Sequence, residues 1–399
     1  MSQQPSTPSV YATPAAPADT NDDLTLHDEQ VRSWRKNGFA LVDGVFPSEL
    51  IERGRAESVK FFPAPGSAES EAVTDYGSGG ELEFPTESDA VNQITLHPRL
   101  LGAVSQLLGL RVLDLRLTQS EPWVKYGRES RSGGSLDNQD QRMHVDYPNH
   151  TLTHPADWDR PEAVSILLYY DRVEECGGAT EFVPRSGPDD SAYQGPLVRT
   201  PGLAGLNFVN DKTKAEAYLR EASPETAKWR EENLYPKARS VQYQPGTVLF
   251  YRQDVWHRGT PINPGAMRLM HNMTFRRADC EWISTVHKGW AWAMYRPSKV
   301  MVKLLAESSV EQRGVLGFPE PGHAYWTRGS LDAVQARLGP FGMDLAPYEE
   351  AWARREASPT GTPADATINQ LRAENSELRE EIARLRARSG SGSATSDPL

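Results

Sequence analysis

The stretch SVQYQPGTVLFYRQDVWHRGTPINPGAMRLMHNMTFRR, residues 240–277, is the most informative about the architecture of the chain. Two short strands are expected on either side of the turn at Pro245 and Gly246, and another is expected after the turn NPGA at residues 263–266. Gly and Pro mark turns, and several short strands separated by such turns are typical of antiparallel sheets. The stretch therefore predicts an antiparallel β-sandwich or barrel.

Three upstream segments continue this pattern of strands. In RVLDLRLTQSEPWVKY, residues 111–126, leucines alternate with charged residues from Leu113 to Leu117, as in a strand with one buried face. The segment EAVSILLYYDRV, residues 162–173, is largely apolar and predicts a buried strand. GGATEFVPRSG, residues 177–187, predicts a turn, a short strand and a second turn. The middle of the chain is therefore expected to be mainly β.

The 399 residues allow one large domain with additional segments. Residues 1–23 are rich in Pro, Ala, Ser and Thr, and we predict that they are disordered, as we do for residues 389–399. The main domain is expected at residues 24–350. Within it, residues 210–236 have a helical composition and predict an insertion that serves as a lid or substrate wall. Residues 351–366, which include ASPTGTPADA, predict a linker.

The composition excludes several classes of protein. The formal net charge is −11 and the pI is near 5.4, which argues against a nucleic-acid groove or an anionic membrane as the main partner. Two cysteines, Cys176 and Cys280, are too few for a disulfide framework. No apolar stretch approaches the roughly 20 residues that span a bilayer. The first residues have neither a basic start nor an apolar block, so we expect no secretory signal and a cytoplasmic protein.

The stretch QRMHVDYPNH, residues 141–150, holds a histidine and an aspartate two positions apart. In a strand, His144 and Asp146 point to the same side, roughly 7 Å apart along the backbone. Taken alone, such a pair is more often a surface patch or a hydrogen-bonded pair than a metal site. A third ligand is therefore required, and His257, at the end of a predicted strand 113 residues after His144, is the candidate.

Two histidines and one carboxylate form the facial triad of non-haem Fe(II) oxygenases. Three protein ligands leave positions open on the metal, where a co-substrate and O2 can bind together, whereas a structural zinc site is closed and typically richer in cysteine. Arg268 lies eleven positions after His257, on the strand that follows the turn. Its planar guanidinium suits a carboxylate, because it can donate two parallel charge-assisted hydrogen bonds. These four residues together predict an iron site that binds a keto acid.

The four residues resemble those of the Fe(II)/2-oxoglutarate-dependent dioxygenases, specifically the phytanoyl-CoA dioxygenase family. The likeness extends to DEQVRSWRKNGFALVDGVF, to GGATEFVPRSG and to PGTVLFYRQDVWHRGTPINP, and it covers roughly residues 24 to 345. It implies a double-stranded β-helix, or jelly roll, with flanking helices. It also implies that His144, Asp146 and His257 bind Fe(II). By the same resemblance, 2-oxoglutarate binds the iron through its keto-acid end and Arg268 through its distal carboxylate, and O2 is the other co-substrate.

Three further residues are candidates for binding 2-oxoglutarate. Thr260 follows the second histidine ligand closely and is placed to donate to the same carboxylate as the arginine, although a turn hydroxyl that donates to the backbone is an equal alternative. Gln119 and Lys125 precede the loop to the first ligand, where the resembled family places co-substrate or substrate contacts. For Lys125 a solvated surface charge is the favoured alternative. His271 should point to the opposite face of its strand from the arginine, as a structural residue.

The expected activity is that of an Fe(II)- and 2-oxoglutarate-dependent oxygenase, most simply the hydroxylation of a C–H bond in a small-molecule substrate with release of succinate and CO2. Related halogenases lack the carboxylate ligand, so the presence of Asp146 favours hydroxylation. Desaturation, epoxidation and demethylation stay open at the same site. The alternative from another class is a non-catalytic jelly-roll binding module, and the presence of all four site residues argues against it. Neither nucleic acid nor a membrane is expected as a partner.

The tail TINQLRAENSELREEIARLRARSG repeats every seven residues. One position of each heptad is isoleucine or asparagine and another is leucine: Ile368, Asn375 and Ile382, with Leu371, Leu378 and Leu385. This a/d pattern predicts a short coiled-coil helix over residues 367–388, and asparagine at the central a position favours two parallel strands. We therefore expect a homodimer, with a helix that packs on its own domain as the alternative.

Overall fold

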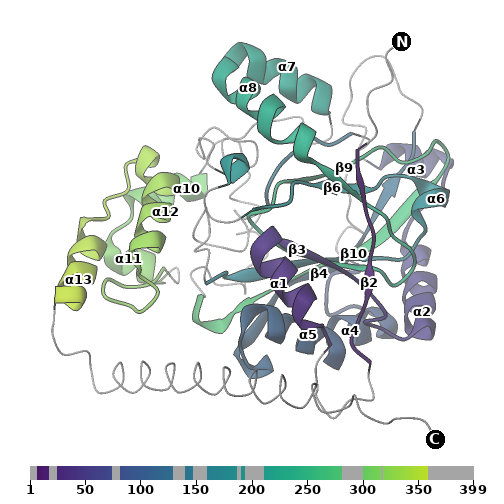
Figure 1. Cartoon of the computed structure of the whole chain (residues 1–399), viewed down its shortest axis with the longest axis horizontal. Coiled ribbons are helices and arrows are strands. Elements are labelled where there is room, and N and C mark those ends of the chain that lie inside the picture. Colours follow the sequence, from purple (N-terminus) through teal and green to yellow (C-terminus); the bar gives the residue numbers. More distant parts are fainter. Residues whose placement is uncertain are drawn as a thin grey trace, which may run out of the picture. The chain divides into compact units, whose positions relative to one another are not determined.

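The computed structural model describes residues 7–17, 25–73, 81–128, 140–146, 160–186, 190–193, 211–280, 300–315 and 318–357 (Figure 1). The predicted coiled coil at residues 367–388 and the tail at residues 389–399 lie outside these ranges. The chain divides into two compact units, Met1–Leu345 and Ala346–Leu399. The first unit contains both β-sheets and every residue predicted for the site.

The larger sheet has six strands in the order β2-β3-β8-β5-β10-β4. In that order, their bounds are Thr13–Pro14, Phe39–Asp43, Val248–Arg252, Ala163–Tyr169, Met267–Arg277 and Leu115–Tyr126. Neighbouring strands are antiparallel, except that β2 and β3 run parallel. The antiparallel sheet that the sequence predicts is therefore confirmed.

The smaller sheet has the order β1-β7-β6-β9. In that order, its strands are Ser9–Val10, Arg239–Val241, Thr180–Phe182 and His257–Gly259. β7, β6 and β9 are antiparallel neighbours, and His144 forms a further antiparallel bridge to His257 beside β9. Along the chain, the strands from β5 to β10 are divided between the two sheets, so the segment passes repeatedly from one sheet to the other.

Strand β5 shows why the middle of the larger sheet is buried on both faces. Val164, Ile166 and Leu168 pack in the cluster that includes the helices, whereas Leu167 and Tyr169 pack in the cluster between the sheets. Successive side chains of a strand point to opposite faces, and both faces are covered here, so the whole strand is apolar rather than alternating.

Helices cover the outer face of the larger sheet (Figure 1). They are α1 (Asp28–Asn37), α2 (Ser48–Ser58), α4 (Asp89–Thr95) and α5 (Pro98–Leu108). In α5, Leu100, Val104 and Leu107 recur every three or four positions and form one apolar stripe toward the sheet. Each fully buried side chain of this kind contributes about 1.5–3 kcal/mol to folding.

Gly38, at the end of α1, packs closely against Val255 in the loop before His257. Gly38 ends α1 with φ 88, a left-handed conformation that favours glycine. A Cβ at this position would lie 2.5 Å from Cγ2 of Val255, so the available space also requires glycine. The close approach fixes the segment that leads into His257.

Two helices form a hairpin on the outer side of the smaller sheet: α7 (Lys212–Ala222) and α8 (Pro224–Asn233) (Figure 1). The remaining helices are α3 (Ala68–Ala72), α6 (Val173–Cys176), α10 (Val300–Glu307), α11 (Val310–Val315), α12 (Arg328–Leu338) and α13 (Ala346–Ala357). Helical residues outnumber strand residues in the described part of the chain. The description "mainly β" is therefore too narrow, because a two-sheet core is covered by helices.

The amino-terminal segment corrects one prediction. Residues 1–23 were expected to be disordered, yet residues 9–14 contribute β1 to the smaller sheet and β2 to the larger one. The amide of Ser240, for example, donates to the carbonyl of Pro8 at 2.9 Å. A segment without apolar periodicity is ordered here because the edges of both sheets offer unpaired backbone groups.

Two other boundaries differ from the predicted ones. Val112–Asp114 form a 3-10 turn, so β4 begins only at Leu115, and Leu113 is 78% exposed. The predicted linker at 351–366 starts inside α13, because its first residues are helix formers such as Ala, Arg and Glu. No helix in the described ranges is long and apolar enough to cross a membrane.

Candidate metal centre

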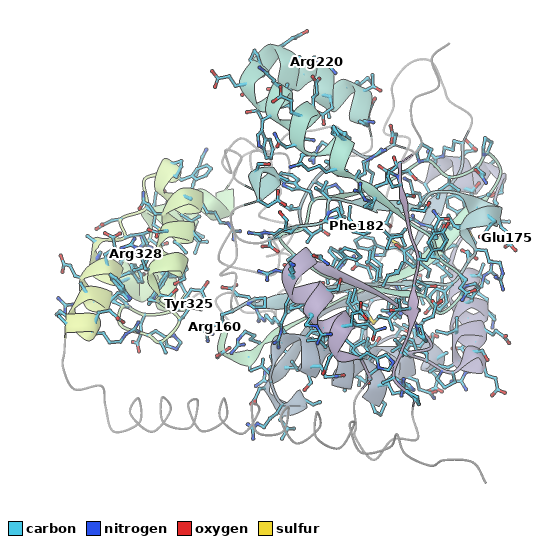
Figure 2. The ribbon with its side chains drawn as sticks, viewed as in Figure 1. Arg160, Glu175, Phe182, Arg220, Tyr325 and Arg328 are labelled. Atoms are coloured by element: carbon cyan, nitrogen blue, oxygen red, sulfur yellow. The ribbon has the colours of Figure 1, made fainter. Side chains whose placement is uncertain are left out.

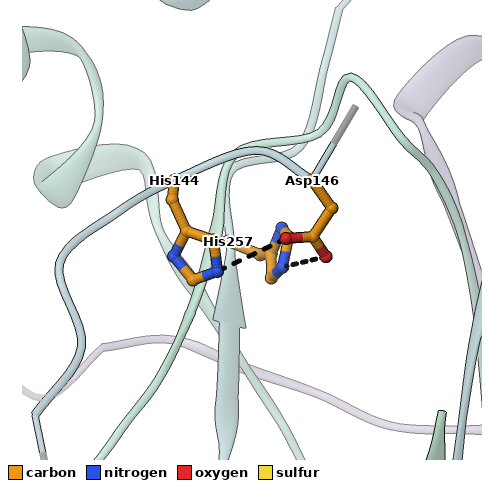
Figure 3. Close-up of side chains that lie close together, drawn as sticks. All are labelled: His144, Asp146 and His257. Carbon is orange, nitrogen blue, oxygen red and sulfur yellow. Dashed lines mark ion pairs between the residues drawn. The ribbon is translucent and has the colours of Figure 1, made fainter. Parts of the chain in front are cut away.

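The three predicted ligands converge on one point (Figure 3). His144 and His257 are bridge partners, and the amide of each donates to the carbonyl of the other at 2.9 Å. This pairing brings the two ring centroids within 4.5 Å. Asp146 Oδ1 lies 3.7 Å from His144 Nε2, and Oδ2 lies 3.1 Å from His257 Nε2. One ligand atom from each residue lies within 4.8 Å of the other two, which is close enough for all three to bind a single ion.

The backbone sets the tautomer of both imidazoles. Nδ1 of His144 lies 2.9 Å from the carbonyl oxygen of Arg142, and Nδ1 of His257 lies 3.0 Å from that of Val255. A carbonyl oxygen only accepts, so each Nδ1 carries the proton and donates. In the neutral form of each ring, Nε2 then has the lone pair, directed at the shared point, as in metal-binding histidines generally.

The pKa values of the two histidines move in opposite directions. Burial, and then the proximity of His257, lower the pKa of His144 to about 3 against the opposing effect of Asp146. Burial also acts to lower the pKa of His257, but the charge of Asp146 and its hydrogen bond outweigh burial, and the pKa is raised. Because metal binding needs neutral imidazoles, a cation would replace the proton that Asp146 favours on His257.

Tyr251, which was not among the residues predicted from the sequence, contacts the carboxylate of Asp146. Its hydroxyl donates to Asp146 Oδ2 at 3.2 Å, and its ring centroid lies 5.0 Å from that of His257. Burial and the neighbouring carboxylate raise the pKa of Tyr251 well above its usual range, so the phenol stays a donor. Alternation along β8 places this side chain between the sheets, but its contact with Asp146 depends on strand pairing that is remote in sequence.

Arg268 is buried between the sheets, with 3% of its surface exposed. One of its N–H groups donates to the carbonyl of Gly178, and its Nε has no hydrogen-bond partner. In the part of the chain that the structure describes, no carboxylate lies within ion-pair distance of this guanidinium. A buried cation without an anionic partner is costly, so this environment suits the binding of an anion.

The three weaker candidates lie in different environments. Lys125 is opposite Arg268 on the neighbouring strand, and its Nζ donates to the carbonyl of Thr260 at 2.8 Å. It is 2% exposed, so the favoured reading of a solvated surface charge is wrong; its strand face turns toward the smaller sheet. The Thr260 hydroxyl donates to the carbonyl of Ala179 at 2.8 Å, as the backbone-bonding alternative expects. Gln119 pairs with Thr274 through the backbone of β4, and its half-buried side chain makes no hydrogen bond among the described residues.

The donor set fits Fe(II). Two imidazole nitrogens and one carboxylate oxygen are the ligands of the facial triad, and they leave other positions on the metal open. No other group of His, Cys, Asp or Glu within the described ranges comes as close together. The set carries one negative charge once both imidazoles are neutral, which suits a divalent cation.

A family model described as phytanoyl-CoA dioxygenase (PhyH) matches residues 34–270, more than half of the chain. No curated protein sequence matches the chain significantly.

Three solved structures illustrate its structural similarities. The non-heme alpha ketoglutarate dependent epimerase SnoN from nogalamycin biosynthesis is 19% identical, with a TM-score of 0.42 over 66% of this chain and 87% of that chain. The carbocyclase SnoK from the same biosynthesis is 17% identical, with a TM-score of 0.44 over 74% and 93%. HygX from Streptomyces hygroscopicus, with nickel and 2-oxoglutarate bound, is 18% identical, with a TM-score of 0.40 over 63% and 88%.

Proposed function

The chain belongs to the phytanoyl-CoA dioxygenase family, and on that premise we propose that it is an Fe(II)- and 2-oxoglutarate-dependent oxygenase that hydroxylates a C–H bond of a small molecule. O2 is the second co-substrate, and succinate and CO2 are released. The observation that carries the proposal is the convergence of His144, Asp146 and His257, with both Nε2 atoms turned to a shared point.

In this proposal the chain's own residues hold and orient the reacting groups. His144, Asp146 and His257 would hold the iron. When bound, Fe(II) with 2-oxoglutarate and O2 supplies an oxidant able to attack an unactivated C–H bond. The protein fixes each imidazole in one tautomer, and the Tyr251 hydroxyl holds one oxygen of the carboxylate, which favours binding of the metal by the other. The metal then meets a preformed set of ligands.

Arg268 would bind the distal carboxylate of 2-oxoglutarate. It lies on the strand that follows β9, faces the space between the sheets and has an unpaired Nε. A guanidinium in such a water-poor place can donate two parallel hydrogen bonds to a carboxylate. Lys125 supports the same region by holding the carbonyl of Thr260, which lies three residues after His257.

We also propose a jelly-roll core and a dimeric assembly. The division of β5 to β10 between two antiparallel sheets, with β4 beside β10, supports a double-stranded β-helix. The heptads of residues 367–388 support a homodimer.

A substrate screen tests the proposal. The full-length protein is supplied with Fe(II) and 2-oxoglutarate, and candidate small molecules are screened for substrate-dependent formation of succinate. Mass spectrometry of the organic product then separates the reactions: hydroxylation adds one oxygen atom, whereas desaturation removes two hydrogen atoms. If the full-length protein fails to bind Fe(II), the metal assignment and the oxygenase activity are both wrong.

A further inference from the structure

Two extended segments carry the metal ligands: residues 140–146, which pair with β9 through the His144–His257 bridge, and β9 itself. We call these segments the ligand strands, and the α7–α8 hairpin covers their second face (Figure 1). Met143 and Val145 alternate with the first two ligands, and Trp256 directly precedes the third. These three side chains form one buried apolar cluster with Leu234 and Ala238, which follow α8. The ligands therefore point to one side of the smaller sheet, and the residues between them pack toward the hairpin.

The hairpin is joined to the first ligand strand where it begins. Asp140 and Asp211 form a parallel backbone bridge, and the amide of Lys212 donates to the carbonyl of Asp140 at 2.9 Å. The Asp211 side chain caps α7 by accepting from the amide of Lys214 at 2.9 Å. The first turn of α7 is thus held four residues before His144.

One buried arginine connects both helices to both ligand strands. Arg230 of α8 is 0% exposed, and its Nη2 lies 2.6 Å from Glu216 Oε1 of α7. The same Nη2 donates to the carbonyl of Met143 at 3.1 Å. The guanidinium carbon lies 5.8 Å from the ring centroid of Trp256. Arg230 thus contacts the residue before each histidine ligand.

Neighbouring groups complete the environment of this arginine. The Tyr235 hydroxyl donates to Glu216 Oε1. Burial acts to raise the pKa of Glu216, but the hydrogen bond and charge of Arg230 outweigh it, and the pKa is lowered, so the pair is ionised. A buried ion pair tolerates little displacement, because each charge depends on its fixed partners to offset the loss of water.

We propose that Arg230 is a positioning residue for the metal centre, and that the hairpin stays docked on the ligand strands instead of opening as a lid. The inference rests on the proposed iron site. Lifting the hairpin would separate Arg230 from the Met143 carbonyl and expose the apolar cluster around Trp256. Of the two roles predicted from composition, a lid or a substrate wall, this proposal replaces the lid: the segment holds His144 and His257 at the spacing that one ion requires.

The test compares two identical substitutions in the same hairpin. Arg230→Met removes the buried arginine. Arg220→Met is the matched control, because Arg220 also pairs α7 with α8, at 2.8 Å from Glu231, but is exposed and lies away from the sheets (Figure 2). The full-length metal-free proteins are titrated with Co(II), whose visible absorption reports ligand geometry. Hydrogen exchange is measured for peptides that contain His144 and His257.

We expect Arg230→Met to bind Co(II) about 10-fold to 100-fold more weakly, which is the usual effect of removing a group that supports metal ligands. Its Co(II) absorption should change, and exchange at the amides of His144 and His257 should accelerate. Arg220→Met should retain the parent affinity, spectrum and exchange rates.

A second variant covers the case in which Arg230→Met does not fold. Tyr235→Phe keeps the ring and loses only the hydroxyl, which donates to Glu216 and accepts from the amide of Met143 at 3.4 Å. It should shift affinity and exchange in the same direction by a smaller factor. The measurement is made on Arg230→Met if it folds, and otherwise on Tyr235→Phe. If that variant keeps the parent Co(II) affinity and spectrum, the positioning role of Arg230 is overturned, while the iron site stands. If the parent protein itself binds no Co(II), the proposed function falls together with this inference.

Discussion

Each histidine ligand donates from Nδ1 to the backbone carbonyl two residues before it. Metal binding therefore depends on the local backbone geometry as well as on the residue type. His144→Ala and His257→Ala should each abolish Fe(II) binding and succinate formation, because two remaining ligands do not hold the ion in place. Iron content after gel filtration and a succinate assay measure both effects. His323→Ala, at an exposed histidine outside the centre, is the control and should retain both. Turnover of His257→Ala at the parent rate would exclude it from the triad.

Arg268→Ala should weaken the binding of 2-oxoglutarate and leave Fe(II) bound, because only the partner of the distal carboxylate is lost. Loss of a charge-assisted pair in a water-poor pocket costs about 2–5 kcal/mol, or roughly tens to thousands of fold in affinity. The Michaelis constant for 2-oxoglutarate measures the effect. Arg277→Ala is the matched control, since Arg277 lies on the same strand but pairs with Asp279 at 2.9 Å. An unchanged constant in Arg268→Ala would remove it from the site.

His271 points away from Arg268, as expected. Its neighbours determine which of its ring nitrogens carries the proton. Ser120 Oγ lies 2.7 Å from its Nε2 and 2.7 Å from the hydroxyl of Thr95, which donates to the carbonyl of Val91. The Tyr170 hydroxyl lies 3.3 Å from Nδ1. A consistent chain of donors runs from Tyr170 through neutral His271 to Ser120 and Thr95. A second imidazole proton would displace the hydrogen bond that Tyr170 donates to Nδ1.

This neutral histidine makes stability depend on pH. Burial lowers the pKa of His271 to about 3, whereas the unfolded chain titrates near 6.5. Between these values the unfolded state binds the proton, so the free energy of unfolding should fall as pH drops below 6.5 and level off near 3. One such group contributes a loss of about 1–2 kcal/mol between pH 7 and pH 5. Urea unfolding at both pH values should show a smaller loss for His271→Gln; equal losses would contradict the assignment.

The site was predictable where residue type and spacing suffice, and not where folding brings remote residues together. His144, Asp146 and His257 stand out because few other functions combine two imidazoles and a carboxylate with a following arginine. Tyr251 and the burial of Lys125 depend on which face of a strand is covered, and that depends on a sheet formed by residues far away in sequence.

Among the elements, the strands from β4 onward were predicted, and the amino-terminal edge strands β1 and β2 were not. Residues 163–169 and 248–252 are apolar because both faces are covered, and Gly or Pro marks their ends. Leu113 was misread as part of a strand because alternation of apolar residues continues into the turn before it. β1 and β2 have no local signal at all, since their order depends on backbone pairing with strands β7 and β3.

The amino-terminal strands β1 and β2 should add to the stability of the fold. Deletion of residues 1–17 should lower the free energy of unfolding by about 1–3 kcal/mol, because it removes several backbone hydrogen bonds that contribute about 0.5–1.5 kcal/mol each. It also removes the partners of Gln30 Nε2, which donates to Thr13 Oγ1 at 2.8 Å and to the carbonyl of Pro14 at 2.9 Å. Urea unfolding measures the loss, and Gln30→Ala should show a fraction of it. An unchanged midpoint after deletion would show that β1 and β2 add no stability.

The proposed chemistry belongs to one compact unit of the chain. All the residues that we assign to iron and 2-oxoglutarate precede Leu345, where the first unit ends. The heptad repeat lies in the second unit, after the segment ASPTGTPADA. The proposed catalysis and the proposed assembly should therefore be separable by truncation, in contrast to the α7–α8 hairpin, which contacts the ligand strands directly.

Removal of residues 366–399 should convert a dimer into a monomer, or into a much weaker dimer, while the succinate assay gives the parent rate. In a parallel coiled coil, Asn375 meets its own copy, and the two amides bond each other within an apolar seam. Asn375→Leu should therefore tighten association but relax the preference for two strands, because the polar group that penalises other oligomers is gone. Light scattering on the full-length, truncated and Asn375→Leu proteins measures the mass of each. If the full-length and truncated proteins have the same oligomeric state, the helix packs on its own domain or binds another protein, and a homodimer formed through this helix is excluded.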